Sequence, residues 1–231
     1  MYNHISRRYR KLELFTTPSS IFGALISDLQ HARESIDMEY YIFANDRTGR
    51  LFADILRRKA RQGVRVRLIV DGYGSFSLSR ELRKALQRDG VELQCHTLLS
   101  HSRYHRKMAI IDGHIAHIGG INILGKWYDV QLRMTGEVVA AISRLYDYDY
   151  MASEGLKCEV PMPYIRRGLQ VVWSESRGRR AMHDLLSDVA CSAQHRLILT
   201  TPYFMPPRNV MQCLGRTVER GVEVTLIVPS P

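Results

Sequence analysis

The sequence lacks a long hydrophobic run. None of its apolar stretches approaches the roughly 18 consecutive residues that a membrane-spanning helix requires, so no such helix is expected. The segment from Met1 to Lys11 is polar and basic and has no apolar core, which argues against a cleavable signal peptide. The sequence therefore predicts neither a bilayer-crossing helix nor a secretory leader.

Cysteine is also scarce. The chain has four cysteines, at positions 95, 158, 191 and 213, and none of them forms a C-x-x-C pair. This spacing excludes a zinc ribbon and a thioredoxin-like redox motif, and it favours a reducing, cytoplasmic compartment. Neither a metal ion nor another cofactor is expected.

What the chain has in excess is positive charge. Lysine and arginine number 33 against 23 aspartates and glutamates, which gives a net charge of +10 and a pI near 9.7. A balance of this kind favours an anionic partner: nucleic acid, an acidic membrane surface or a phosphorylated substrate. The hydrophobic content of 45% is enough for a sizeable core, so wholesale disorder is excluded.

Helical and strand patterns alternate along the chain. The segment Pro18–Ser20 offers a helix N-cap, and a glycine closes each of the next two helical patterns. The remaining expected elements are strands at Ile36–Phe43, Val64–Val70 and Val91–Cys95 and helices at Leu51–Arg61 and Leu78–Arg88. Strand–helix–strand units of this length predict an α/β fold with a mainly parallel sheet flanked by helices.

Part of the pattern occurs twice. The segment Gly63–Val70 matches Gly221–Val228 at six of eight positions, at an offset of 158 (221 − 63 = 158). Upstream, Ile36 corresponds to Leu197 at an offset of 161 (197 − 36 = 161), so a short gap lies inside the unit. The sequence predicts two homologous halves, the second of which stops after its second strand.

The most unusual segment runs from His105 to Asn122 and has the pattern H-x-K-x4-D-x6-G-G-x-N. Two β-prone runs flank Asp112-Gly113, a strong hairpin turn. Because alternate strand residues share a face, His105 and Lys107 should project to the same side. An ammonium, an imidazole, the backbone N–H groups of Gly119–Gly120 and the Asn122 amide are together suited to bind an anion and to transfer a phosphoryl group.

This pattern resembles the HKD motif of the phospholipase D superfamily. The segments Met38–Phe43, Asp71–Ser75 and Thr201–Phe204 are similar to the bacterial cardiolipin synthase branch. So is Trp127-Tyr128-Asp129, in which a tyrosine stands where that branch usually has arginine. The resemblance implies a phospholipase D-like fold with one complete repeat at residues 1–155, followed by a linker and an incomplete second repeat at residues 156–231.

The resemblance also implies a metal-free double displacement. His105 would be the nucleophile that forms a phosphohistidine. Lys107, Gly119, Gly120 and Asn122 would hold the phosphate oxygens, and Asp129 would orient His105 through its other ring nitrogen. Asp112 belongs to the motif and is counted with the candidate catalytic residues, although at the hairpin turn it is expected to shape the loop rather than to touch substrate.

A second motif histidine would fall near position 263 (105 + 158 = 263), so the chain holds one motif and is expected to be truncated. In single-motif members of the superfamily two copies complete the site, and a homodimer is an alternative here as well. The beginning of a second half in the chain argues against that arrangement.

Several residues admit more ordinary interpretations. His114 and His117 are expected at the surface of the hairpin rather than on a metal ion. Glu39 is either a hydrogen-bond acceptor behind the site or an end-of-strand carboxylate. The run Arg57–Arg61 is expected on the outer face of a helix. The run Tyr146–Tyr150 is expected to end a helix that packs on the sheet, with an aromatic membrane rim as the alternative.

The resulting hypothesis is a phosphatidyltransferase that makes cardiolipin from two phosphatidylglycerols and releases glycerol, in a chain that is itself incomplete. Its partners would be anionic phospholipid and a membrane surface, and it would be cytoplasmic and peripheral at the inner membrane. The alternatives are a phosphodiesterase or nuclease of the same superfamily, with nucleic acid as the less favoured partner, and a non-catalytic fragment that binds anionic lipid.

Overall fold

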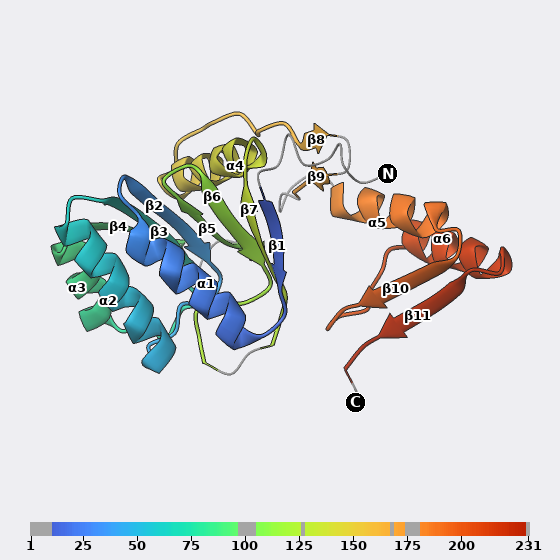
Figure 1. Cartoon of the computed structure of the whole chain (residues 1–231). Helices are drawn as coiled ribbons and strands as arrows, with labels where there is room; N and C mark the ends of the chain where they lie inside the picture. The colour runs from blue at the N-terminus through green and yellow to red at the C-terminus, as the bar shows by residue number, and fades with distance from the viewer. Residues whose placement is uncertain (1–10, 97–104, 126–127, 167–168, 174–180, 230–231) are drawn as a thin grey trace. The chain divides into compact units, whose positions relative to one another are not determined.

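The computed structural model describes residues 11–96, 105–125, 128–166, 169–173 and 181–229. The chain divides into two compact units, Met1–Val171 and Val172–Pro231 (Figure 1). The short hairpin of β8 (Tyr164–Arg166) and β9 (Leu169–Val171) belongs to the first unit. The compact first unit therefore extends to Val171 and includes this hairpin.

A seven-stranded sheet forms the centre of the first unit, in the order β1-β7-β6-β5-β2-β3-β4. Its strands are β1 (Lys11–Phe15), β2 (Ser35–Tyr40), β3 (Arg65–Asp71), β4 (Val91–His96), β5 (Lys107–Ile111), β6 (Ile115–Gly119) and β7 (Gln131–Thr135). The three strands expected from the sequence, before β5, are present within one to three residues of their expected bounds. The hairpin of β5 and β6 is also present, with its turn at Asp112-Gly113.

The α/β architecture is as expected, but the expectation of a mainly parallel sheet is wrong. Only β2, β3 and β4 are parallel neighbours, and the other four strand pairs are antiparallel. One of these four pairs follows from the motif itself, because a short turn between β5 and β6 can join only antiparallel strands. The sheet is therefore mixed.

Four helices accompany this sheet: α1 (Pro18–His31), α2 (Arg47–Arg61), α3 (Arg80–Arg88) and α4 (Val138–Ser153). The N-cap of α1 is Thr17, whose hydroxyl accepts a hydrogen bond from the Ser20 N–H at 3.3 Å, and Pro18 takes the first helical position. The observed N-cap therefore lies one residue before the segment Pro18–Ser20, where the sequence predicted it. Gly63 ends α2 with a φ of 87°, a left-handed conformation that favours glycine.

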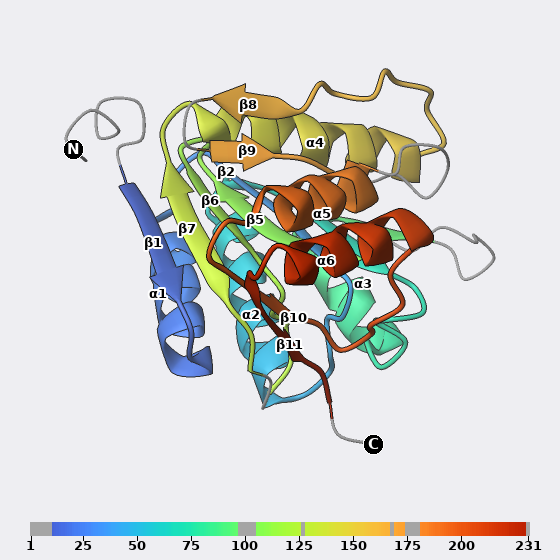
Figure 2. The same ribbon diagram turned by 90° about the vertical axis from the view of Figure 1, so that its right-hand side faces the viewer.

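Helices α1, α2 and α3 cover one face of the sheet and enclose the apolar core (Figures 1 and 2). Alternate residues of β2 and β3 point into this core and meet apolar side chains of the helices. Core residues include Leu25, Leu29, Phe52, Leu56, Ile36, Met38, Tyr40 and Leu68. Lys59 is also buried on this side and donates to the Ala32 carbonyl at 2.9 Å. The expectation that the whole run Arg57–Arg61 lies on an outer face is therefore wrong for Lys59.

The opposite face of the sheet meets α4 through charged groups. Arg67 donates to Asp37 and to Asp147, each at 2.7 Å, and its guanidinium lies 4.9 Å from the ring centres of Tyr146 and Tyr150. Tyr146 is fully buried and Tyr150 is 9% exposed. These two tyrosines pack on the sheet, as expected, and the alternative of an aromatic membrane rim is wrong for them.

The second unit repeats part of the first. It consists of α5 (Ala181–Ser192), β10 (Arg196–Thr200), α6 (Arg208–Glu219) and β11 (Glu223–Ile227). Strands β10 and β11 are parallel, and the pairing of Arg196 with Glu223 reproduces that of Ser35 with Arg65 in β2 and β3. The predicted internal repeat is therefore visible in the strand register.

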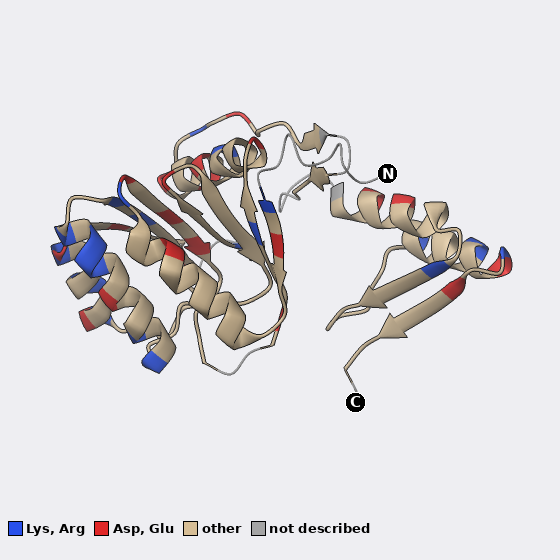
Figure 3. Ribbon diagram, in the orientation of Figure 1, with Lys and Arg blue, Asp and Glu red and all other residues tan. Residues whose placement is uncertain are grey.

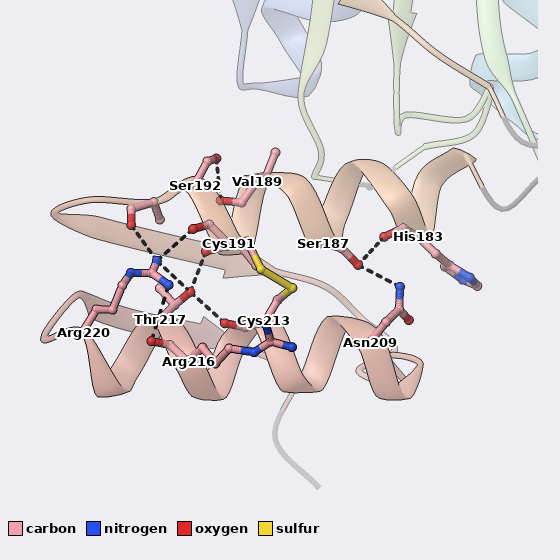
Figure 4. The surroundings of a disulfide bond; sticks show 12 residues. His183, Ser187, Val189, Cys191, Ser192, Asn209, Cys213, Arg216, Thr217 and Arg220 are labelled. Atoms are coloured by element: carbon pink, nitrogen blue, oxygen red, sulfur yellow. Dashed lines mark hydrogen bonds between the residues drawn. A yellow bond between two sulfur atoms is a disulfide. The ribbon is translucent and has the colours of Figure 1, made fainter.

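A disulfide joins α5 to α6 within this second unit. It links Cys191 to Cys213, whose Cα atoms are 5.1 Å apart (Figure 4). Nearby, the Thr217 hydroxyl donates to the Ala190 and Cys213 carbonyls. The spacing of the cysteines did not predict this pair, and an expectation of reduced cysteines is wrong for it. Cys95 and Cys158 are free thiols.

Candidate functional site

The candidate residues gather at one edge of the first unit's sheet. At this edge β2, β3 and β6 end, while β5 begins. The carboxyl ends of parallel strands commonly form the binding edge of α/β proteins. His105 lies two residues before Lys107, which is the first residue of β5.

His105 and Lys107 converge as the strand alternation predicts. The Lys107 Nζ lies 3.0 Å from the His105 Nδ1 and donates to the His105 carbonyl at 2.7 Å. Lys107 is only 5% exposed. An ammonium can only donate hydrogen bonds, so the Nδ1 of His105 is the acceptor in this arrangement.

Burial lowers the pKa values of both Lys107 and His105. Burial lowers the pKa of Lys107 from 10.5 to about 8, although the negative charges of Asp129 and Glu39 oppose this fall. Burial and the neighbouring Lys107 also lower the pKa of His105, against an opposing contribution from Asp71. The imidazole is therefore neutral at pH 7, as a nucleophile must be.

Two neighbours of His105 were not assigned to the site from the sequence. The Tyr41 ring lies 4.5 Å from the imidazole centre, and the Lys107 Nζ is 5.2 Å from the centre of the same ring. Asp71, at the end of β3, is 3% exposed and acts electrostatically on His105. Tyr41 directly follows β2, and Asp71 is the last residue of β3. Their positions at the carboxyl ends of parallel strands were the sequence signal that could have indicated a role at this edge.

The glycine pair brings the Asp129 carboxylate to the same place. A Cβ built on Gly120 would lie 2.2–2.3 Å from the carboxylate atoms of Asp129, so this approach requires glycine. The Asn122 side chain is 5% exposed, and its carbonyl oxygen accepts from the Ile42 N–H at 2.9 Å. This hydrogen bond holds the Asn122 amide beside the end of β2 and uses its carbonyl oxygen rather than its NH₂ group.

The expected contact between Asp129 and His105 is not formed. Of the residues that the structure describes, Lys107 contacts the His105 Nδ1, while the Asp129 carboxylate accepts from the Val130 N–H at 2.8 Å. Asp129 is nevertheless close enough to Lys107 to raise its pKa. Trp127, which precedes it in the family pattern, lies outside the described residues.

Asp112 lies at the other end of β5, apart from this cluster. Its carboxylate accepts hydrogen bonds from the N–H groups of Arg33, Glu34 and Ser35 at 2.8–3.1 Å. Burial alone would raise the pKa of Asp112, but these three donors lower it below its ordinary value. Asp112 thus fastens the hairpin to the start of β2, and its place among the candidate catalytic residues has no support in the geometry.

Behind the site, on the α4 face, lies a buried charged cluster. Arg106, between His105 and Lys107, forms a short ion pair with Asp149 of α4, and its Nη1 is 4.0 Å from Glu39. Glu39 is fully buried, and burial together with Asp149 raises its pKa well above the ordinary range. Glu39 is therefore an interior carboxyl behind the site and not an exposed carboxylate at a strand end.

The two hairpin histidines differ in their environments. His114 is exposed at the turn, as expected. His117 is fully buried and its Nε2 lies 2.7 Å from Asp28 of α1, so the expectation of a surface position is wrong for it. The reason is that β6 is an interior strand covered by α1. Among the described residues, no group of three or more His, Cys, Asp or Glu side chains could hold a metal ion.

The chain is similar in sequence to a known protein family. The family model described as "Cardiolipin synthase, PLD-like domain" matches residues 25–143. A probable cardiolipin synthase, YwiE of Bacillus subtilis (strain 168), is 32% identical over 90% of this chain and 47% of its own length. Cardiolipin synthase A of Citrobacter koseri is 30% identical over 95% of this chain and 51% of its own length.

Among solved structures, the phosphatidylserine synthase of Haemophilus influenzae Rd KW20 has the same fold, with a TM-score of 0.69 and 16% identity. It aligns with 96% of this chain and 64% of its own. The polyphosphate kinase of Porphyromonas gingivalis aligns with 95% of this chain and 35% of its own, with a TM-score of 0.67 and 19% identity. The chain spans about half the length of the curated relatives it matches.

Proposed function

Because this chain belongs to the family of cardiolipin synthase, PLD-like domains, we propose that it carries one half of the active site of a cardiolipin-forming phosphatidyltransferase. The observation that carries this proposal is the convergence of the His105 imidazole and the Lys107 ammonium, 3.0 Å apart at one edge of the sheet. A neutral imidazole beside a buried cation is suited to attack a phosphodiester whose negative charge the cation compensates.

In the proposed first step, the His105 Nε2 attacks the phosphorus of phosphatidylglycerol. A P–N bond forms while the P–O bond to glycerol breaks, and the departing glycerol takes a proton from the histidine of a second motif. In the second step, that histidine removes the proton from a hydroxyl of another phosphatidylglycerol. The resulting oxygen attacks phosphorus, breaks the P–N bond and yields cardiolipin.

For the Nε2 of a neutral imidazole to attack, the proton must reside on Nδ1. In the structure Lys107 donates to Nδ1, so this interaction must change when substrate binds. The substrate's phosphate oxygens would attract the Lys107 ammonium, and Asp129 would then accept the Nδ1 proton in a hydrogen bond. Asn122 and the N–H groups of Gly119–Gly120 would hold the remaining oxygens.

The histidine of a second motif would have to come from further sequence or from a second copy of the chain. The length of the curated relatives, about twice that of this chain, supports the first source. None of the helices that the structure describes has the length and apolar character to span a bilayer. Because the chain has a net charge of +10, we infer that it associates peripherally with an anionic membrane surface.

The test uses the 231-residue chain extended by the second-motif sequence that the proposed reaction requires, with vesicles of labelled phosphatidylglycerol, followed by thin-layer chromatography. Cardiolipin and free glycerol are the expected products, and trapping in base should reveal a labelled phosphohistidine even where transfer is slow. His105→Ala should abolish both signals, whereas His114→Ala, at the exposed turn, should leave them intact. Unaltered turnover by His105→Ala would contradict the assignment. Nicking of plasmid without any new lipid would instead identify a phosphodiesterase.

A further inference from the structure

Exposed apolar side chains gather at the edge of the sheet that holds His105. The segment between β3 and α3 carries Tyr73 and Phe76, which are 57% and 82% exposed. The segment that leads into β7 carries Tyr128 and Val130, which are 82% and 52% exposed. These four residues are called the aromatic rim below. Large apolar side chains at such exposure, grouped together, indicate an interaction surface.

The aromatic rim is joined directly to the site on one side. A Cβ built on Gly74 would lie 2.3 Å from the Tyr41 carbonyl oxygen and 2.9 Å from its ring. The Ser75 hydroxyl donates to the same carbonyl at 3.0 Å. Since the Tyr41 ring lies 4.5 Å from the His105 ring, the segment that carries Tyr73 and Phe76 is packed against a direct neighbour of the nucleophile.

On the other side the connection runs through Asp129. Tyr128 and Val130 flank Asp129 in sequence, and the Asp129 carboxylate lies against Gly120 and acts on Lys107. The exposed rim residues therefore border the His105–Lys107 pair from two separate segments of the chain.

The opposite edge of the sheet has a different character. It is formed by the turns at residues 32–34, 62–64, 89–90 and 112–114. Among the described residues of these turns, no large hydrophobic side chain is exposed. Exposed apolar residues lie elsewhere in the first unit as well, Leu12 of β1 among them, so the contrast concerns these turns alone.

Positive charge accompanies the aromatic rim. Arg47 and Arg50 lie in the first turn of α2 and Arg80 begins α3, and all three are exposed. Figure 3 shows Lys and Arg at both ends of α2. Because both helices follow strands that end at the site, their first turns lie at the same edge. Glu81 is the exposed acid beside Arg80. At the opposite ends of the helices, Asp89 already pairs with arginines of α2.

We infer that the aromatic rim seats this edge of the first unit on the surface of an anionic lipid bilayer. Aromatic side chains favour the interfacial region of a membrane, and arginines beside them attract acidic headgroups. In this orientation His105 and Lys107 face the layer of phosphodiesters. The inference rests on the proposed function for the identity of the substrate, but the binding itself does not require turnover.

The experiment measures flotation of the whole chain with vesicles of phosphatidylcholine that contain or lack phosphatidylglycerol. The test variant is Phe76→Ser/Tyr128→Ser, which alters the two most exposed rim residues and no buried one. Its affinity for the anionic vesicles should fall on the order of tenfold or more. The matched control, Leu12→Ser/Met162→Ser, changes exposed apolar residues away from this edge and should bind like the unaltered chain.

A charge comparison completes the design. Arg47→Gln/Arg80→Gln should weaken binding to anionic vesicles, whereas Arg58→Gln/Arg88→Gln, exposed at the other end of the same helices, should have a smaller effect. Equal binding of the rim variant and the unaltered chain would overturn the inference, as would an equal loss in the control.

The outcome is separable from that of the proposed function. If the unaltered chain binds vesicles and the rim variant does not, but the two-motif protein forms no cardiolipin, the docking surface stands and the proposed activity falls. If cardiolipin forms and the rim variant makes it as fast on vesicles as on dispersed short-chain phosphatidylglycerol, the activity stands and the docking surface is refuted. Loss on vesicles alone supports both.

Discussion

Replacement of Lys107 by methionine should make the first unit more stable while removing anion binding. The lysine is 5% exposed, and its pKa is lowered from 10.5 to about 8. A shift of one pKa unit corresponds to about 1.4 kcal/mol. The charged form is therefore destabilised in the folded chain by at most about 3 to 4 kcal/mol. Hydrogen bonds to His105 and residual water reduce our expectation for Lys107→Met to about 2 kcal/mol.

The pH dependence of this gain has a definite sign. Because the folded pKa of Lys107 is below the unfolded one, the penalty is fully present below pH 8. Between about pH 8 and 10.5 the folded chain binds fewer protons than the unfolded chain, so the penalty fades as pH rises. The advantage of Lys107→Met should accordingly be largest near neutral pH and should vanish by about pH 10.5.

Urea unfolding at a series of pH values, followed by far-UV circular dichroism, measures this difference. Lys84→Met, an exposed position on α3, is the matched control and should change little. Lys107→Met should also lose its binding of inorganic phosphate. A variant that is less stable than the unaltered chain at pH 7, or whose advantage persists at pH 10.5, would refute the reasoning.

Three further predictions concern other contacts. Gly120→Ala should lower kcat/KM roughly a hundredfold, because its Cβ would displace the Asp129 carboxylate, whereas Gly23→Ala, with open space around its Cβ, should not. Asp112→Ala should cost about 2 kcal/mol in thermal or urea unfolding but leave kcat unchanged; a selective loss of kcat would restore Asp112 to the site. Cys213→Ser, or a reductant, should destabilise the second unit by about 3 kcal/mol, because the disulfide closes a loop of 22 residues. Hydrogen exchange of the amides of this unit measures the loss, and unchanged protection would contradict the prediction.

The candidate site was largely predictable from the sequence because its key relation is local. His105 and Lys107 are two positions apart on one strand, and strand alternation alone places them on one side. The glycine pair and Asn122 follow by a short turn, so they return to the same edge. The expected partnership of His105 with Asp129 was less secure, since it depends on the orientation of one imidazole ring and on which neighbour reaches its Nδ1.

Relations between distant segments were not predictable in this way. The direction of β5 relative to β2 depends on how the sheet is assembled, and the helix–strand alternation before it gave no sign of an antiparallel addition. The burial of His117 depends on α1, whose Asp28 is far away in sequence. The pairing of Cys191 with Cys213 likewise requires two helices to pack, and cysteine spacing carries no information about that.

The hydrogen bonds of Asp112 have a consequence for how the site could diversify. Strands β2 and β5 pair along their length, and at the far end the Asp112 carboxylate ties the hairpin to the residues that begin β2. The start of β5, which carries Lys107, is thus held by a rigid frame of paired strands, whereas Tyr41, Asn122 and Asp129 reach the site from the adjoining segments. Grafting new loops onto this frame would alter which molecules can enter while leaving the spacing of imidazole and ammonium undisturbed.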